Sequence, residues 1–273
     1  MLCPIKPIKS NLFSLFINIQ PSLKGLLDNK SYIFNNSLSS VRIGKTFKTS
    51  SINRIPLTSS YIFSLKRNFK KIHDIGSSDG TSSYELIKNL KFDEYILMDK
   101  YLYLYLFQNE NKIYLFDHLN NLHMYENDNY KLYLDPLHQS NSITEIILNL
   151  IFKSDKLVNI NKSEILCINK EILKLNKNIK YEVYDLFEEP LYKNSDLILI
   201  TNLIHNLKLN KKTLAKIKKN ILNMASDNCL IAIGENTDKE RTTFLRYRNN
   251  NLFYYHSING GSVSKKFIKY LLK

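Results

Sequence analysis

The sequence predicts an α/β fold built around a mostly parallel sheet with an antiparallel hairpin at its C-terminal end. Three observations predict it. A strand-like run, a glycine-bearing turn and a helical pattern follow one another over residues 70–89. A second strand-like run, 92–98, ends at Asp99. A nearly continuous apolar run at 195–201 is typical of a central strand buried on both faces.

The glycine-bearing turn follows Asp74, which closes the first strand-like run. Gly76 and Gly80 are two of only seven glycines in the chain. A strand, a tight glycine turn and a helix together bring backbone N–H groups against a nucleotide-like ligand. The dinucleotide fingerprint Gly-x-Gly-x-x-Gly would require glycine where this chain has Ser78 and Thr81. The turn therefore argues against a nicotinamide-dependent oxidoreductase.

The run Asp-Ile-Gly-Ser-Ser-Asp-Gly from Asp74 to Gly80 resembles the first motif of class I S-adenosylmethionine-dependent methyltransferases. In that family the acid faces the amino group of the methionine part, and the glycines let the backbone approach the ligand. Ser78 stands where most members carry glycine, and a negative φ would accommodate it. The resemblance implies a Rossmann-like methyltransferase sheet and S-adenosyl-L-methionine as the cofactor. The cofactor-binding residues that it implies here are Asp74, Gly76, Ser77, Ser78, Asp79 and Gly80.

Further polar residues follow the later strands in the same order. Asp99 closes the second strand about 20 residues after the glycine turn, where Rossmann-like folds bind ribose hydroxyls. The resemblance implies that Asp185, directly after a strand at 180–184, contacts the adenine amino group with Leu186 beside the ring. Asn202 ends the fourth strand, which lies beside the methyl group in this family. These four residues complete the predicted cofactor site.

The distance from Asp99 to Asp185 exceeds one βαβ unit by about 50 to 60 residues. We therefore expect a methyltransferase-like domain over 69–273, interrupted by an insertion at about 100–162. The insertion should hold a β-hairpin and a helix at 142–152 and supply much of the acceptor pocket. Residues 1–68 form an N-terminal extension with a short helix at 11–19. After the fourth strand we expect a helix at 211–224, a strand at 227–233 and a hairpin turning at 249–251.

The amino-acid composition indicates which kinds of binding partner and which compartment to expect. The net charge is +14 and the pI about 9.4, but Lys, Asn, Ile and Tyr are abundant together, as in an A/T-biased genome. Because the basic residues are dispersed along the sequence, with the densest cluster at 66–71, we do not expect nucleic acid as a partner. Three widely spaced cysteines offer no metal or disulfide spacing and favour a reducing, cytoplasmic compartment. No apolar run reaches the length of a membrane span. The sequence leaves open whether the chain forms a homodimer.

The chemistry of methyl transfer needs little acid–base catalysis, because the sulfonium donor is already activated and the acceptor needs positioning. His205, just past the fourth strand, is the candidate general base for an acceptor that loses a proton. The Asn/Asp-Pro-Pro-aromatic signature that grips a planar amine is absent after that strand. We therefore expect methylation of an oxygen on a small molecule. Two alternatives stay open: a non-catalytic binding protein of this fold and an RNA methyltransferase.

Overall fold

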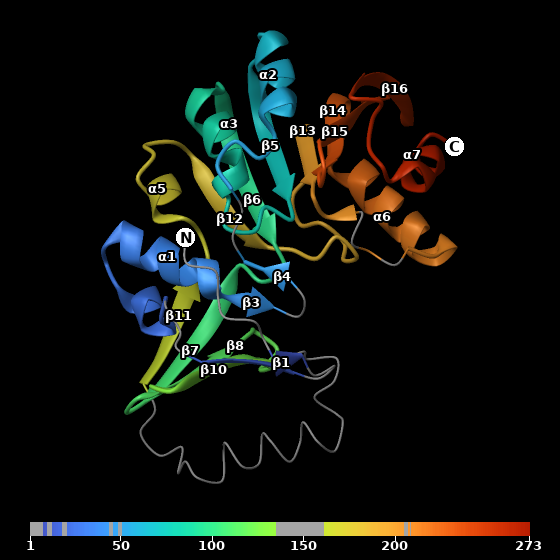
Figure 1. The fold of residues 1–273 in the computed structure, drawn as a ribbon. Helices are drawn as coiled ribbons and strands as arrows, with labels where there is room; N and C mark the ends of the chain where they lie inside the picture. Colours follow the sequence, from blue (N-terminus) through green and yellow to red (C-terminus); the bar gives the residue numbers. More distant parts are fainter. Residues whose placement is uncertain are drawn as a thin grey trace. The chain divides into compact units, whose positions relative to one another are not determined.

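The computed structural model describes residues 8–9, 13–17, 21–43, 46–48, 51–134, 161–204, 207 and 209–273. The chain divides into two compact units (Figure 1). We call 50–102 with 172–273 the parallel-sheet unit, and 1–49 with 103–171 the antiparallel-sheet unit. Each unit contains a seven-stranded sheet.

The parallel-sheet unit has the strand order β12-β6-β5-β13-β14-β15-β16. The first five strands are parallel, whereas β15 runs antiparallel to both β14 and β16. The predicted mostly parallel sheet with an antiparallel C-terminal hairpin is thus confirmed. The strands are β5 (Phe69–Ile75), β6 (Phe92–Asp99), β12 (Ile179–Val183), β13 (Ser195–Thr201), β14 (Ala225–Asn236), β15 (Glu240–Arg248) and β16 (Asn251–Ile258).

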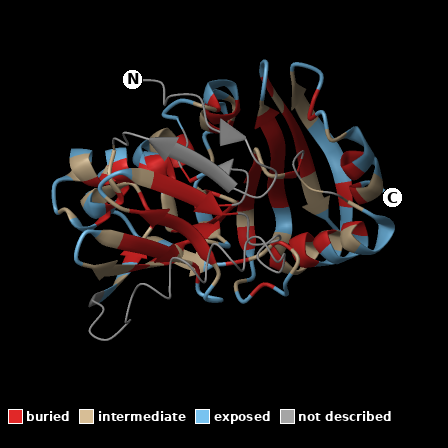
Figure 2. Ribbon diagram, turned by 60° about the horizontal axis from the view of Figure 1, so that its bottom comes forward, coloured by how far each residue is buried: buried red, intermediate tan, exposed pale blue. Residues whose placement is uncertain are grey.

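Helices cover both faces of this sheet. Alternate residues of a strand point to opposite faces, so Ile75 and Asp74 of β5 lie on different sides. The face of Ile75 packs against α6 and α7 in one hydrophobic cluster, and its strands are largely buried (Figure 2). The opposite face carries Asp74, below the start of α3. The helices are α2 (Pro56–Ser64), the 3₁₀ turn η2 (Thr81–Ser83), α3 (Tyr84–Asn89), α6 (Lys211–Met224) and α7 (Lys265–Leu271).

The N-terminus of α2 is capped by a side chain from a distant strand. The N-cap residue Ile55 offers no side-chain hydrogen bond. Instead Glu240 of β15 accepts from the amides of Leu57 at 2.8 Å and Thr58 at 2.6 Å. A carboxylate is favourable there because it pairs with unsatisfied N–H groups and with the positive end of the helix dipole.

Replacing Glu240 by Ala is expected to lower the free energy of unfolding by about 1–2 kcal/mol, because it removes this cap. Urea unfolding followed by circular dichroism measures the change. Asp238→Ala in the same hairpin is the control. It removes a surface ion pair with Arg241, for which we expect less than about 1 kcal/mol. Equal losses in the two variants would contradict a capping role for Glu240.

The antiparallel-sheet unit joins N-terminal strands to the inserted segment, in the order β1-β2-β10-β9-β8-β7-β11. The strands are β1 (Ile8–Lys9), β2 (Phe13–Ile17), β7 (Tyr103–Asn109), β8 (Lys112–Phe116), β9 (Leu122–Glu126), β10 (Tyr130–Leu134) and β11 (Asn161–Leu166). The unit also holds η1 (Leu23–Leu27), α1 (Ser31–Ser40) and the small pair β3 (Arg42–Ile43) and β4 (Thr46–Phe47), and α5 (Lys170–Leu173) spans the division between the units.

Two expectations for this region need correction or completion. The predicted helix at 11–19 is wrong for its central part, because residues 13–17 form β2 and pair with β10 along five residues. Pairing with a partner strand decides the structure of so short an apolar run. The insertion contributes four consecutive antiparallel strands, more than the expected hairpin. The expected helix at 142–152 lies outside the described residues.

The compact units also divide the chain differently from the expected domains. Residues 50–68, expected in the N-terminal extension, belong with the parallel sheet, because α2 is held by Glu240. Residues 1–49 belong with the inserted strands, since β2 pairs with β10.

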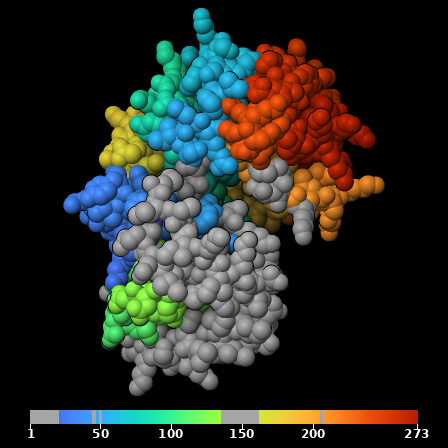
Figure 3. All heavy atoms as spheres, viewed as in Figure 1, coloured from blue at the N-terminus to red at the C-terminus, as the bar shows by residue number. Residues whose placement is uncertain are grey.

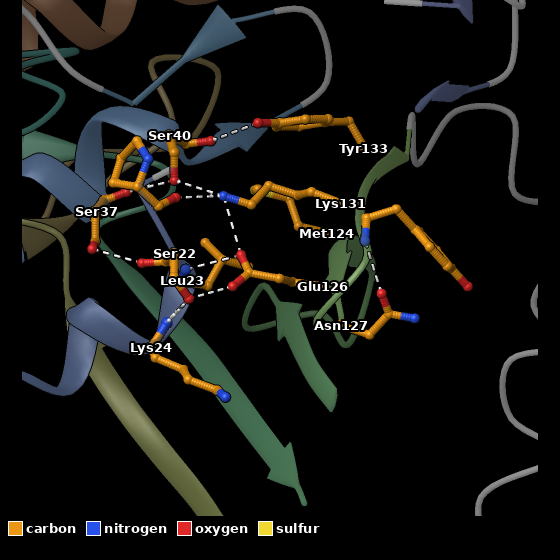
Figure 4. A network of polar contacts seen from close by, with 12 residues as sticks. Ser22, Leu23, Lys24, Ser37, Ser40, Met124, Glu126, Asn127, Lys131 and Tyr133 are labelled. Carbon is orange, nitrogen blue, oxygen red and sulfur yellow. Dashed lines mark hydrogen bonds and ion pairs between the residues drawn. The ribbon is translucent and has the colours of Figure 1, made fainter. Parts of the chain in front are cut away.

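A buried ion pair links β9, β10 and the segment that precedes η1 (Figure 4). Lys131 is fully buried, and its ammonium group donates to Glu126 at 3.1 Å, the Pro21 carbonyl at 2.7 Å and the Ser40 hydroxyl at 3.3 Å. Glu126 also accepts from the Ser22 hydroxyl and from the Leu23 amide at 2.9 Å. All three ammonium protons and both carboxylate oxygens therefore have partners, as burial of a charge requires.

In the part of the chain that the structure describes, no helix has the length and apolarity to cross a membrane. Among the same residues, no three His, Cys, Asp or Glu side chains gather into a possible metal site.

Candidate functional site

The ends of the parallel strands bring the predicted cofactor residues to one edge of the sheet. β5 lies between β6 and β13, so the strand order reverses at β5. In open α/β sheets, ligands bind outside the carboxyl ends of the strands at such a switch point. Asp74, Asp99, Asp185 and Asn202 all lie at or just after the carboxyl ends of their strands.

The glycine turn contains three residues in the left-handed region of φ. Gly76 has φ +72°, Ser78 +57° and Gly80 +77°. The negative φ that would accommodate serine without strain is therefore not what the structure has at Ser78. A hydrogen bond across the edge accompanies this conformation: the Ser78 amide donates to Asp99 Oδ2 at 2.9 Å. Serine tolerates this conformation less well than glycine, and the bond to Asp99 helps to hold the turn in place.

Asp99 connects two loops through its carboxylate. Oδ2 accepts from the Ser78 amide, and Oδ1 accepts from the Tyr101 amide at 2.9 Å. Asp99 is half-buried, and a carboxylate oxygen can accept more than one hydrogen bond. Its role toward ribose hydroxyls stays a prediction, and its position between the glycine turn and the next loop is compatible with it.

The glycines serve the packing of the turn itself. A Cβ at Gly80 would lie 2.6 Å from Ile172 Cδ1 and 3.1 Å from Leu97 Cδ1, and a Cβ at Gly76 would lie 3.0 Å from Leu203 Cδ2. A side chain at Gly80 would therefore collide with neighbouring apolar side chains, which already occupy that direction. Positive φ and close packing together explain glycine at both positions.

Asp74 is buried beneath the turn, with 1% of its surface exposed. Its Oδ2 accepts from the Ser83 hydroxyl and from the Tyr95 hydroxyl at 3.1 Å. Burial raises the pKa of Asp74 to about 6, against the lowering effect of these two bonds, and the nearby Asp99 adds to the rise. The geometry gives Asp74 a supporting role below the start of α3. Its predicted contact with a methionine amino group stays untested.

Asp79 caps the first turn after Gly80. Its Oδ1 accepts from the Thr81 amide at 3.0 Å and its Oδ2 from the Thr81 hydroxyl at 2.7 Å. The Ser77 amide donates to the Met98 carbonyl at 3.1 Å, which fastens the turn to β6. The side chains of Ser77 and Asp79 are thus both buried within the turn.

The loop after β12 carries the predicted adenine residues. Asp185 forms an ion pair with Lys100 at 3.0 Å and accepts from the Phe187 amide at 3.0 Å. Leu186 is buried, with 4% of its surface exposed. The loop is held by a residue that the sequence analysis missed: Asn220 of α6 donates to the carbonyl of Leu186 at 3.0 Å and to that of Glu188 at 2.6 Å. An amide within the apolar stripe of a helix was the available signal.

The loop after β13 begins at Asn202, which has φ +56°. Its side-chain oxygen accepts from the Asn236 amide at 2.8 Å, and its own amide donates to the Gly234 carbonyl at 2.8 Å. Asn202 therefore ties the carboxyl ends of β13 and β14 together. His205, the candidate general base, lies outside the described residues.

Comparisons with known proteins give structural likenesses only. No model of a known protein family matches the chain, and no curated protein matches it. The N-methyltransferase NodS from Bradyrhizobium japonicum, in complex with S-adenosyl-L-homocysteine, is 9% identical with a TM-score of 0.34, over 68% of this chain and 64% of that one. Human N-acetylserotonin methyltransferase, in complex with SAM, is 11% identical with a TM-score of 0.35, over 68% of this chain and 34% of that one. Both are methyltransferases.

The matched part spans less than two-thirds of either solved structure. At these identities and TM-scores the likenesses do not establish what this chain does. The fold rests on its own strand order, and the candidate site on the turn and strand-end geometry.

Proposed function

We propose that the parallel-sheet unit binds S-adenosyl-L-methionine and transfers its methyl group. The observation that carries this proposal is the hydrogen bond between Ser78 and Asp99. It joins the glycine turn after β5 to the acid after β6 at the switch point of the sheet. The glycine turn and Asp99, about 20 residues apart in the sequence, thus meet at the same point of the sheet edge.

The residues at this edge fit the chemistry of such a cofactor. Asp99 offers carboxylate oxygens to ribose hydroxyls, and Asp185 offers an acceptor to an exocyclic amine. The backbone of the turn at Ser77 and Ser78 would lie alongside the cofactor, near the ribose that Asp99 binds. Asn220 holds the loop of Asp185 and Leu186. We infer that these residues bind and orient the cofactor.

When bound, the cofactor supplies an activated methyl group on a sulfonium, so the chain's own contribution is positioning and exclusion of water. For the acceptor we propose an oxygen of a small molecule, with His205 as the candidate base. A second candidate, a nucleic acid, is favoured by a lysine-rich surface described below.

Replacing Asp99 by Asn is expected to weaken binding of S-adenosyl-L-methionine roughly ten- to hundred-fold, since hydrogen bonds to a charged group contribute about 1.5–3 kcal/mol. Asparagine keeps one oxygen as an acceptor for the Ser78 amide. Isothermal titration calorimetry on the full chain measures the change, and we expect the unchanged protein to bind in the micromolar range. Asp93→Asn, on an exposed residue at the other end of β6, is the matched control.

Absence of binding heat at millimolar cofactor, with a folded sample, would refute the proposed function. Equal affinities of the Asp99 and Asp93 variants would refute the ribose assignment alone. A non-catalytic binding protein of the same fold would bind the cofactor and show no methyl transfer to any candidate acceptor.

A further inference from the structure

Helices α6 and α7 lie on the same face of the parallel sheet and turn their other faces to solvent (Figure 1). The apolar residues of both helices, among them Ile217 and Phe267, belong to the hydrophobic cluster beneath. Figure 3 shows the surface of this part of the chain in orange and red. The side chains on the outer faces therefore make no contribution to the packing of the helices against the sheet.

Every charged side chain on the two helices is a lysine. The two helices and the C-terminal residue hold nine lysines and no Asp or Glu. All of them are exposed except Lys218, which is half-buried. We call this set the lysine face: Lys211, Lys212, Lys216, Lys218, Lys219, Lys265, Lys266, Lys269 and Lys273.

Composition alone does not explain the lysine face. The chain has 39 basic and 25 acidic residues, so about three or four of nine charged residues would be acidic if the signs were mixed. An A/T-biased genome exchanges Arg for Lys, but it leaves Asp and Glu common elsewhere in this chain. Along the sequence the basic residues are dispersed, whereas in the structure eight lysines lie on two neighbouring helices and a ninth, Lys273, follows α7.

The charge on this face is largely uncompensated. Within the described part of the chain, the one ion pair of the lysine face joins Lys216 to Glu188 at 3.5 Å, with both side chains about half or more exposed. Lys212 and Lys216, like Lys265 and Lys269, are four residues apart on one helix, an arrangement in which like charges destabilise the helix. A bound polyanion would relieve this repulsion.

One exposed aromatic side chain flanks the lysine face on the edge strand β16. Tyr254 is 57% exposed. Tyr254 pairs with Leu245 across the strands, so the two side chains share a face of the sheet. Leu245 belongs to the cluster under α6 and α7, which places Tyr254 on the side of the lysine face. Aromatic rings beside cations suit nucleic acids with unpaired bases, because phosphates meet the cations and bases stack on the rings.

An anionic membrane is the less suitable polyanion. Peripheral helices bind membranes by burying an apolar face in the lipid, and the apolar faces of α6 and α7 are already buried in the protein. The exposed apolar residues next to α7 are Val263 and Leu272, which offer little apolar area for insertion.

We propose that the lysine face binds single-stranded nucleic acid, with Tyr254 stacking on one of its bases. Helix α6 follows the carboxyl end of β13 in the chain. A nucleic-acid strand bound along α6 would therefore extend toward the carboxyl edge of the parallel sheet, where the candidate site lies. The binding itself does not depend on the proposed methyl transfer. A chain that binds no cofactor would still bind nucleic acid here.

The test is fluorescence anisotropy of the full chain with a labelled 20-nucleotide oligouridine. With four to six phosphate contacts, we expect the affinity to fall roughly 50- to 300-fold between 50 and 200 mM salt, since each contact adds about −0.7 to the log–log slope for single strands. The variant Lys212→Gln/Lys216→Gln/Lys219→Gln should flatten this slope by about two. The matched control neutralises three exposed lysines elsewhere in the unit, Lys91, Lys193 and Lys239.

Two further arms separate the proposal from its rivals. The variant Tyr254→Ala should weaken single-strand binding roughly five-fold or more, because a stacked base contributes about 1–3 kcal/mol, and should leave duplex binding unchanged. Vesicles of phosphatidylcholine with one-quarter phosphatidylserine test the membrane.

The proposal is overturned if oligouridine does not bind at 50 mM salt, if the control variant loses as much affinity as the α6 variant, or if the α6 variant loses binding to vesicles only. Circular dichroism spectra of all surface variants should match the parent, because none of the replaced side chains is buried.

Discussion

Replacing Lys131 by Met is expected to destabilise the chain by about 3–5 kcal/mol, the cost of leaving one charge of a buried pair without its partner. Methionine fills a similar volume, so the loss is electrostatic. Glu126 would remain buried with a negative charge, and the Pro21 carbonyl and Ser40 hydroxyl would each lose a donor. Burial lowers the pKa of Lys131 and the neighbouring Glu126 opposes that effect. Urea unfolding followed by circular dichroism measures the loss.

Lys24→Met is the matched control in the same unit. Lys24 pairs with Asp128 at 3.9 Å, and both side chains are about half exposed or more, so we expect a loss under about 1 kcal/mol. The double variant Lys131→Met/Glu126→Gln should be more stable than Lys131→Met, because glutamine removes the unpaired charge and keeps an oxygen for the Leu23 amide. A single variant no more harmful than the control would mean that the pair contributes little to folding.

The central strands and the long helix were predictable from the sequence. The apolar run at 195–201 became β13, and the periodic run at 211–224 became α6, with the same bounds. Both segments are long, and their burial pattern is local information. The strand at 13–17 was not predictable, because its partner β10 lies more than a hundred residues away. The division into units follows from that same distant pairing.

The candidate site was predictable in its strand-end acids and not in their interactions. Asp74 and Asp99 follow from strand pattern and spacing. The positive φ of Ser78 does not, because it depends on the bond to Asp99. Tyr95 reads as one apolar residue of a buried strand, yet its hydroxyl supports Asp74. Hydrogen bonds between residues some 20 positions apart thus decide what the turn looks like.

The second large effect that we expect concerns pH, and it arises from two adjacent residues on opposite faces of β5. His73 is fully buried, neither of its ring nitrogens has a hydrogen-bond partner in the described structure, and its ring meets Tyr192 edge-on. Burial and the nearby Lys71 lower the pKa of His73 to about 4, against the smaller opposing effect of Glu94. Asp74, in contrast, has a pKa raised to about 6, chiefly by burial.

The two shifts act on stability with opposite signs. Between pH 4 and 6.5 the unfolded chain protonates His73 and the folded chain does not, so acidification through this window destabilises the fold by about 3 kcal/mol in total. Between pH 3.8 and 6 the folded chain protonates Asp74 and the unfolded chain does not. Acidification through that window therefore stabilises the fold by about 3 kcal/mol. In the unchanged protein the two contributions nearly cancel over their shared range.

Single replacements should expose each contribution. Relative to the parent, His73→Leu should gain about 3 kcal/mol of stability on acidification from pH 6.5 to 4, because the loss caused by histidine disappears. Asp74→Asn should lose about 3 kcal/mol over pH 6 to 4 on the same comparison, and the double variant should follow the parent. Urea midpoints at half-unit pH steps measure the differences, with the exposed His118→Leu as control. If both single variants keep the parent's pH profile, His73 and Asp74 titrate alike in the folded and unfolded chains. If stability relative to the parent changes with pH in opposite directions in the two variants, His73 and Asp74 of β5, next to the candidate site, determine much of the pH dependence of folding.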